Sequence, residues 1–84
     1  MQAGYLAGQS VMRQDVQALL QHSYLWTRAA SEVVPPVAGQ VAPALTVAAQ
    51  LYEAGQYVAA MNQIGGAVQL VRQARQVYPA LPEL

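Results

Sequence analysis

Apolar residues recur at intervals of three and four along most of this chain, which is the spacing that places side chains on one face of an α-helix. The first such stretch covers about residues 10–34, and Ser10 fits the capping position at its start. The predicted apolar face of this helix consists of Met12, Val16, Leu19, Ser23, Trp26 or Thr27, Ala30, and Val33 or Val34, with Leu20 and Tyr24 widening it. We predict that the helix ends before Pro35 and Pro36, because proline lacks a backbone N–H and restricts the residue before it.

A connector and a second, shorter helix are predicted next. We interpret residues 35–42, which follow the helix end with two prolines and a glycine, as the connector. Pro43 then fits the first turn of a helix over residues 43–54, where a backbone N–H has no partner within the helix. The packing candidates of this helix are Leu45, Ala48, Ala49, Leu51 and Tyr52. Gly55 favours a tight turn, since glycine adopts the positive φ that often follows a helix end.

A third helix over about residues 56–78 has the clearest amphipathic pattern. Its stripe consists of Tyr57, Met61, Ile64, Val68, Val71, Ala74 and Tyr78, flanked by Ala60 and Ala67. Gly65 and Gly66 interrupt the stripe, and each costs about 1 kcal/mol relative to alanine in a helix. They mark either a kink or a place where a second helix crosses closely. The pattern continues in phase on both sides, which favours the close crossing. Pro79 ends the helix and leaves a short tail, residues 79–84.

These elements predict an all-α protein, either a three-helix bundle or a helical array, that forms one domain over residues 1–84. The second and third helices are expected to form a tight hairpin at Gly55. Residues 1–9 contain two glycines and no clear period, so we predict a loose N-terminal arm there. No segment shows the alternation of period two that indicates a strand.

The composition adds a tendency to associate. Hydrophobic residues make up 55% of the chain, with 16 Ala and 11 Val but no Phe. Charged residues make up 10%, there is no Lys, and the net charge is zero, so solubility depends largely on 12 Gln. A surface with few charges and no net charge tends to associate. The same composition also arises from the codon bias of a GC-rich genome, and the two explanations are compatible.

Several functions are disfavoured by charge and residue type. Four scattered arginines do not form the basic face that nucleic acids or anionic membrane surfaces require. The absence of cysteine excludes a disulfide framework and a thiolate nucleophile. No basic segment followed by an apolar core begins the sequence, so we expect a cytoplasmic protein by default. Residues 33–52 and 54–71 are uncharged and long enough to span a membrane. Their prolines, glutamines and low Leu/Ile/Phe content argue against spanning, and a membrane-associated form stays an open alternative.

Residues 44–70 contain a helix-turn-helix pattern with small and large apolar residues at defined offsets. These residues are Leu45, Ala48, Leu51, Gly55, Tyr57, Ala60, Ile64, Ala67 and Leu70, within the string LYEAGQYVAAMNQIGGAV. The element Gly-x-Tyr-x-x-Ala is the most characteristic part, because the glycine turns the chain, the tyrosine wedges between the helices and the alanine lets their backbones meet. In these features the segment resembles a single tetratricopeptide repeat.

The resemblance covers about a third of the chain and has two departures. Arg72 stands where the repeat usually has proline, and the preceding sequence has Gln21 and Ser23 at the offsets of the glycine and tyrosine. A plain helix hairpin with a small turn residue gives the same pattern. The resemblance implies a binding scaffold or chaperone for a peptide or partner helix, and it assigns no individual binding residue.

The sequence offers little for catalysis or cofactor binding. His22 is the only histidine, lies toward the polar side of its helix, and is two turns from Asp15, too far for a direct hydrogen bond. Metal sites and general acid–base catalysis both need a positioned partner group. We therefore predict no catalytic, metal-binding or cofactor-binding residues and expect that the protein is not an enzyme.

Two groups of residues are candidates for binding a protein partner. Tyr24 and Trp26 flank Leu25, and the three side chains cannot all face the core from one helix. Either Trp26 fills the core while the Tyr24 hydroxyl stays hydrated, or the pair forms a docking patch, since both residue types anchor interfaces. Arg72, Arg75 and Tyr78, spaced by three, form a second candidate edge, for which a solvated face is the alternative interpretation.

These features together favour a non-catalytic helical interaction module. It would serve as a small adaptor, or as a chaperone or assembly factor of a larger complex, and it would bind a protein partner. The alternative is a structural subunit of a homo-oligomer, a filament or a membrane-associated complex, because helices that are apolar on more than one face must be buried somewhere.

Overall fold

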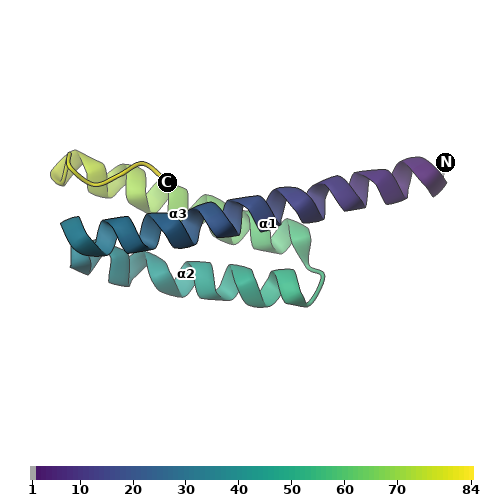
Figure 1. Ribbon diagram of the computed structural model, residues 1–84, viewed down its shortest axis with the longest axis horizontal. Helices are drawn as coiled ribbons and strands as arrows, with labels where there is room; N and C mark the ends of the chain where they lie inside the picture. The colour runs from purple at the N-terminus through teal and green to yellow at the C-terminus, as the bar shows by residue number, and fades with distance from the viewer. Residues whose placement is uncertain (1) are drawn as a thin grey trace.

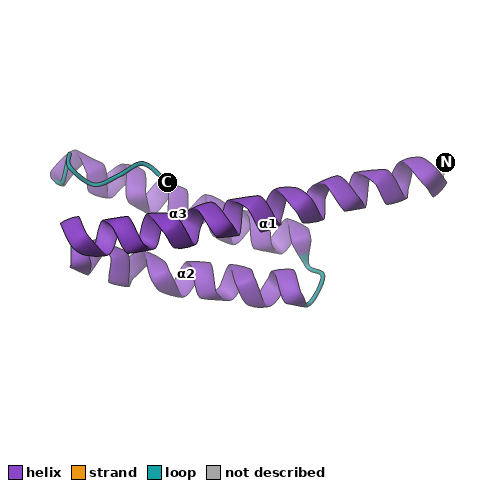
Figure 2. Ribbon diagram, in the orientation of Figure 1, coloured by secondary structure: helices purple, strands orange, loops and turns teal. Residues whose placement is uncertain are grey.

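The computed structural model describes the backbone of residues 2–84 and the side chains of residues 12–84. The chain forms three helices, α1 (Gln2–Val33), α2 (Pro35–Glu53) and α3 (Tyr57–Val77), which confirms the all-α prediction. They run up, down and up, so that α2 is antiparallel to both neighbours (Figure 1). Within residues 2–84, the turn between α2 and α3 and the C-terminal tail stand out as non-helical segments (Figure 2).

The connection between α1 and α2 is a single residue, Val34. Its φ of −138° and ψ of 78° are extended, as expected for a residue before proline. Pro35 and Pro36 occupy the first turn of α2, where their missing N–H groups cost nothing. The connector predicted over residues 35–42 is therefore wrong. The prolines end one helix and begin the next, and Val37, Ala38 and Val41 are buried.

Pro43 lies inside α2 rather than in its first turn. A proline at an interior position removes the hydrogen bond to the carbonyl four residues earlier, here that of Gly39. Both residues are exposed, so water can bind the freed carbonyl. The helix therefore continues past Pro43, which lies on its solvent-exposed side.

The turn at Gly55 agrees with the sequence prediction. Gly55 has φ of 77°, and the N–H groups of Gly55 and Gln56 donate to the carbonyl oxygens of Tyr52 (3.0 Å) and Leu51 (2.8 Å). This is the hydrogen-bond pattern of a Schellman motif, which satisfies the last carbonyls of α2. The rings of Tyr52 and Tyr57 pack across the turn with centroids 5.8 Å apart. The hairpin of α2 and α3 is thus closed by backbone and side chains together.

The core consists of buried residues that recur at spacings of three and four along each helix, as in left-handed helix bundles. We call the line of buried residues on one helix its seam. The seams consist of Val16, Leu20, Ser23, Trp26 and Ala30 on α1, Val37, Ala38, Val41, Leu45 and Ala48 on α2, and Ala60, Ile64, Ala67 and Val71 on α3. On α3 the alanines lie at the centre and not at the edge as predicted, and Met61 is exposed. Ala60 and Ala67 are fully buried and alternate with Ile64 and Val71 along the same face of α3.

Gly65 and Gly66 are exposed on the outer side of α3, and a Cβ added to either glycine would meet nothing within 4 Å. The predicted close helix crossing at this point is therefore wrong. The helix continues through both glycines without interruption. The alanines of the seam, not the glycines, allow the close approach.

The first helix begins at Gln2, so residues 2–9 of the predicted loose arm are helical; Met1 lies outside the described residues. Glycine weakens a helix by about 1 kcal/mol but does not block it as proline does. The N-terminal turns of α1 project beyond the α2–α3 turn, and the molecule measures 48 × 19 × 17 Å (Figure 1). Over the residues described, none of the three helices combines the length and hydropathy of a membrane span.

Candidate partner-binding site

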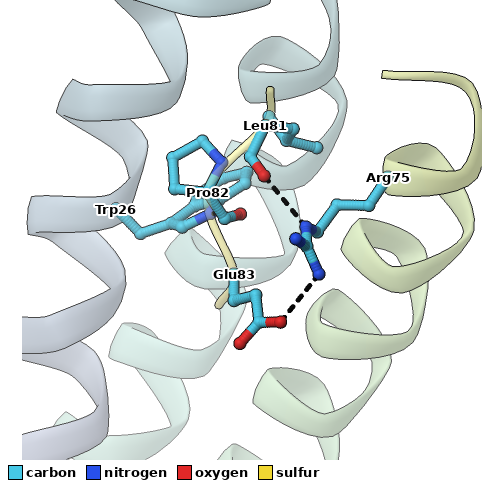
Figure 3. A network of polar contacts seen from close by, with 5 residues as sticks. All are labelled: Trp26, Arg75, Leu81, Pro82 and Glu83. Atoms are coloured by element: carbon cyan, nitrogen blue, oxygen red, sulfur yellow. Dashed lines mark hydrogen bonds and ion pairs between the residues drawn. The ribbon is translucent and has the colours of Figure 1, made fainter. Parts of the chain in front are cut away.

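The C-terminal tail, residues 79–84, lies between α1 and α3 and brings two of the predicted site residues together. Trp26 approaches it from α1, and Arg75 approaches it from α3 (Figure 3). These helices contact each other less than either contacts α2. The tail therefore covers the side of the bundle where helix–helix packing is weakest.

Leu81 anchors the tail in the core. Its side chain is 1% exposed and belongs to a hydrophobic cluster that includes Trp26 and Val71. The chain reaches this position through a turn after α3, in which the N–H of Leu81 donates to the Tyr78 carbonyl oxygen at 3.0 Å. Leu84 packs against the same cluster from a partly buried position. The tail is thus an integral part of the core.

Trp26 is a core residue with 3% exposure, and its indole Nε1–H donates a 2.7 Å hydrogen bond to the carbonyl oxygen of Pro82. A buried indole N–H needs such a partner, because an unpaired donor in the core is costly. Tyr24, which points away from the core, is 50% exposed. The two residues predicted as one docking patch are therefore separated, and the alternative in which Trp26 fills the core describes the structure.

Arg75 holds the other side of the tail through two contacts. Its Nε–H donates to the carbonyl oxygen of Leu81 at 2.9 Å, and its Nη1 lies 2.8 Å from Glu83 Oε1 (Figure 3). The Glu83 side chain is 78% exposed, so the ion pair is screened by water and contributes little stability. The hydrogen bond to the main chain of Leu81 is the more sheltered contact.

Arg72 lies one turn before Arg75 and borders a small depression beside the tail. The depression has a volume of about 180 Å³ and is lined by Val68, Val71, Arg72, Arg75, Glu83 and Leu84. Arg72 and Arg75 thus share one edge of α3 as predicted, and Arg75 is engaged by the tail.

Tyr78 lies on the other side of the end of α3, where an open groove separates this helix from the start of α2. The groove has a volume of about 300 Å³ and is lined by Pro36, Val37, Gln40, Leu70, Gln73, Ala74, Val77 and Tyr78. No lining residue carries a charge. Val77 and Tyr78 are 70% and 45% exposed, so two large apolar side chains border this groove from the solvent side.

The sequence interpretation missed Leu81, Pro82 and Glu83 as parts of the site. The one sequence signal for these residues is a leucine that lies between two prolines in a short tail. That pattern indicates an extended segment but does not indicate where the segment docks.

Polar side chains elsewhere in the described region do not gather into a reactive group. His22 and Asp15 are both exposed on α1. Among residues 12–84, no three His, Asp or Glu side chains lie close enough together to hold a metal ion. Within the same residues 12–84, the one buried polar side chain is that of Ser23, whose hydroxyl donates to the Leu19 carbonyl oxygen at 2.7 Å.

Comparisons of the chain with protein-family models, with curated proteins and with solved structures give no match.

Proposed function

We propose that this protein is a non-catalytic helical interaction module that serves as a small adaptor, or as a chaperone or assembly factor of a larger complex. The observation that carries the proposal is the uncharged groove between the start of α2 and the end of α3. Its rim exposes Val77 and Tyr78 beside each other, at 70% and 45%. Single exposed apolar residues are ordinary, whereas apolar side chains grouped around a concave surface are typical of protein contacts.

The chemistry of the groove limits the kind of partner. Without a charged lining residue, the groove offers no partner for a buried ion, so a charged segment entering it would lose hydration without compensation. Tyr78 offers both an aromatic face and a hydroxyl at the rim, a combination that is common in interface anchors. The partner segment is therefore expected to be apolar and uncharged where it meets Val77 and Tyr78.

The tetratricopeptide-like hairpin adds support of a different kind. Gly55 turns the chain, Tyr57 packs against Tyr52, and Ala60 is fully buried at the α2–α3 contact. A hairpin closed in this way is a rigid support for a binding surface at its far end. Rigid elements hold contact residues more accurately than loops do.

Co-purification with a matched pair of variants tests the proposal. Tyr78→Ala and Tyr24→Ala remove the same side chain from positions of similar exposure, 45% and 50%, and only Tyr78 borders the groove. We expect a chemically crosslinked partner to be recovered with the wild-type chain and with Tyr24→Ala, and to be lost with Tyr78→Ala. The proposal is overturned if the wild-type chain is a stable helical monomer that recovers no partner. It is also overturned if Tyr24→Ala and Tyr78→Ala recover the partner equally well.

A second candidate function is head-to-tail self-assembly, which the two dissimilar apolar ends of the molecule favour. Beside the α2–α3 turn, next to the projecting N-terminal turns of α1, lies a depression of about 220 Å³ lined by Met12, Gly55, Gln56, Tyr57, Val58 and Ala59, and the opposite end of the molecule exposes Val33, Val77 and Tyr78. Contacts between unlike ends do not close into a dimer and generate rings or filaments. Light scattering over a range of concentrations tests this, because Val58→Asp should abolish any growth in mass whereas Val47→Asp, on the outer face of α2, should not.

A further inference from the structure

We propose that the channel between α1 and α3 is a recognition site for an extended apolar–Pro–acidic segment of a protein partner, and that the tail is the resident competitor of that segment. The proposal rests on the interaction function proposed above and names a partner chemistry for a second surface. The channel is the space that Leu81, Pro82 and Glu83 occupy between Trp26 and Arg75 (Figure 3).

The way in which the tail is held is that of a bound peptide. Two consecutive carbonyl oxygens, those of Leu81 and Pro82, accept hydrogen bonds from side chains on two different helices, Arg75 at 2.9 Å and Trp26 at 2.7 Å. Main-chain contacts of this type fix the direction and register of an extended segment without depending on its side chains. Side-chain pockets then provide the sequence preference.

Each of the three tail residues meets a different requirement of the channel. Leu81 is buried to 1% exposure beside Trp26 and Val71, so the channel requires a large aliphatic side chain at this position. Pro82 brings no backbone N–H that would need a partner there. Glu83 lies 2.8 Å from Arg75, which favours an acidic residue at the third position. The preferred sequence is therefore apolar, proline, acidic.

The tail can leave the channel without unfolding the helices. Leaving uncovers Leu81, Leu84 and Trp26 and breaks two hydrogen bonds and one exposed ion pair, while the backbone hydrogen bonds of α1, α2 and α3 stay intact. A segment outside the helices opens locally at a lower free-energy cost than the unfolding of the whole bundle. A partner segment binds only the open fraction of molecules, so its apparent affinity is reduced by that fraction.

The test uses the full chain and a fluorescent peptide with the sequence of residues 78–84. Leu81→Ala weakens the resident tail and should bind this peptide at least about tenfold more tightly than the wild-type chain does, because the open fraction rises. The matched control is Leu25→Ala, which removes the same side chain from an exposed position and should bind the peptide as the wild type does. A peptide with alanine in place of its leucine at the Leu81 position should not bind Leu81→Ala.

A second variant covers the case in which Leu81→Ala fails to fold. Glu83→Arg replaces an exposed side chain, leaves the core unchanged and places a like charge beside Arg75, so it should loosen the tail and raise peptide affinity, to a smaller extent than Leu81→Ala does. Adding Trp26→Phe to either variant removes the indole donor and should weaken peptide binding several-fold. If both tail variants stay helical and bind the peptide no better than the wild type does, the inference is overturned.

Three further outcomes separate this inference from its rivals. Wild-type dimers that disappear in Leu81→Ala would assign the channel to the tail of a second copy and overturn its assignment to a partner. Failure of peptide binding, together with partner recovery that still depends on Tyr78, would overturn this inference and leave the proposed function standing. Peptide binding without any Tyr78-dependent partner would support the channel and count against the groove.

Discussion

The indole Nε1–H of Trp26 donates a hydrogen bond of 2.7 Å to the carbonyl oxygen of Pro82, 56 residues further along the chain. This contact joins the C-terminal part of the first helix to the C-terminal tail. On the other side of the tail, Arg75 donates to the preceding carbonyl, that of Leu81. The only tryptophan of the protein is therefore placed where its fluorescence reports on the docking of the tail.

Leu81→Ala should lower the free energy of unfolding by about 2–3 kcal/mol, near the low end of leucine-to-alanine changes in cores, because the tail can adjust around the loss. The emission of Trp26 should shift to longer wavelength in the same variant as water reaches the indole. Urea unfolding followed by circular dichroism and by fluorescence measures both effects. Leu25→Ala, at a side chain that is 66% exposed, should change stability by less than about 0.5 kcal/mol. Equal losses for the two variants would show that the tail does not stabilise the core.

Arg75→Ala should destabilise the protein more than Glu83→Ala does, because the arginine also bonds the Leu81 carbonyl. A double-mutant cycle should give a coupling of at most about 1 kcal/mol between Arg75 and Glu83, given that the ion pair is exposed. The coupling should decrease further in 1 M salt. A coupling that is large and independent of salt would mean that the pair is sheltered from water.

Gly65→Ala and Gly66→Ala should each raise the free energy of unfolding by about 0.5–1 kcal/mol. Both glycines lie in a helix with open space where a Cβ would project, so alanine gains helix propensity without a clash. Gly55→Ala should have the opposite effect and cost about 1–2 kcal/mol, since φ at this position is +77°. Denaturant midpoints of the three variants provide the comparison, and destabilisation by the two helical substitutions would point to a partner helix at these glycines.

Ala60→Leu and Ala67→Leu should each destabilise the bundle by about 1–3 kcal/mol or more, because both alanines are fully buried where the helices approach. Ala18→Leu, at an exposed position of α1, adds the same atoms and should be close to neutral. Thermal unfolding of the three variants tests the assignment of the seam. If Ala60→Leu and Ala67→Leu are as stable as Ala18→Leu, the assignment of the seam is contradicted.

Pro43→Ala should stabilise the protein by about 1–3 kcal/mol, because it restores an interior backbone hydrogen bond of α2 at an exposed site. Pro36→Ala, in the first turn of the same helix, restores no such bond and should change stability much less. The difference between the two variants in urea unfolding isolates the effect of position within the helix. Destabilisation by Pro43→Ala would indicate that the proline holds a bend that the bundle needs.

Local features of the chain were predictable from the sequence. Helix periodicity predicted three helices but missed residues 2–9 of α1 and 35–42 of α2, and Gly55 marked the turn, because both signals depend on a few neighbouring residues. The buried face of α1 followed in part from the same periodicity, but four residues predicted on it are exposed, namely Met12, Leu19, Tyr24 and Val33. At the candidate site, Arg72 and Arg75 share one edge of α3, whereas Tyr78, predicted on the same edge, lies on the other side of the helix end.

Features that depend on two distant segments were decided only by the tertiary structure. Two prolines look the same whether they belong to a connector or to the first turn of a helix, and the burial of Val37, Ala38 and Val41 against the other helices decides between them. Gly65 and Gly66 permit a close crossing, but the neighbouring helices pack on the alanine face instead.

The sequence by itself determined that this protein is three amphipathic helices with a hairpin turn at Gly55, because period and turn propensity are local properties. Only the tertiary structure decided that Trp26 is buried, that Tyr24 is exposed and that Leu81 completes the core. The gap that Leu81 fills exists only when α1 and α3 lie side by side, and no local pattern records the shape of a space between two helices.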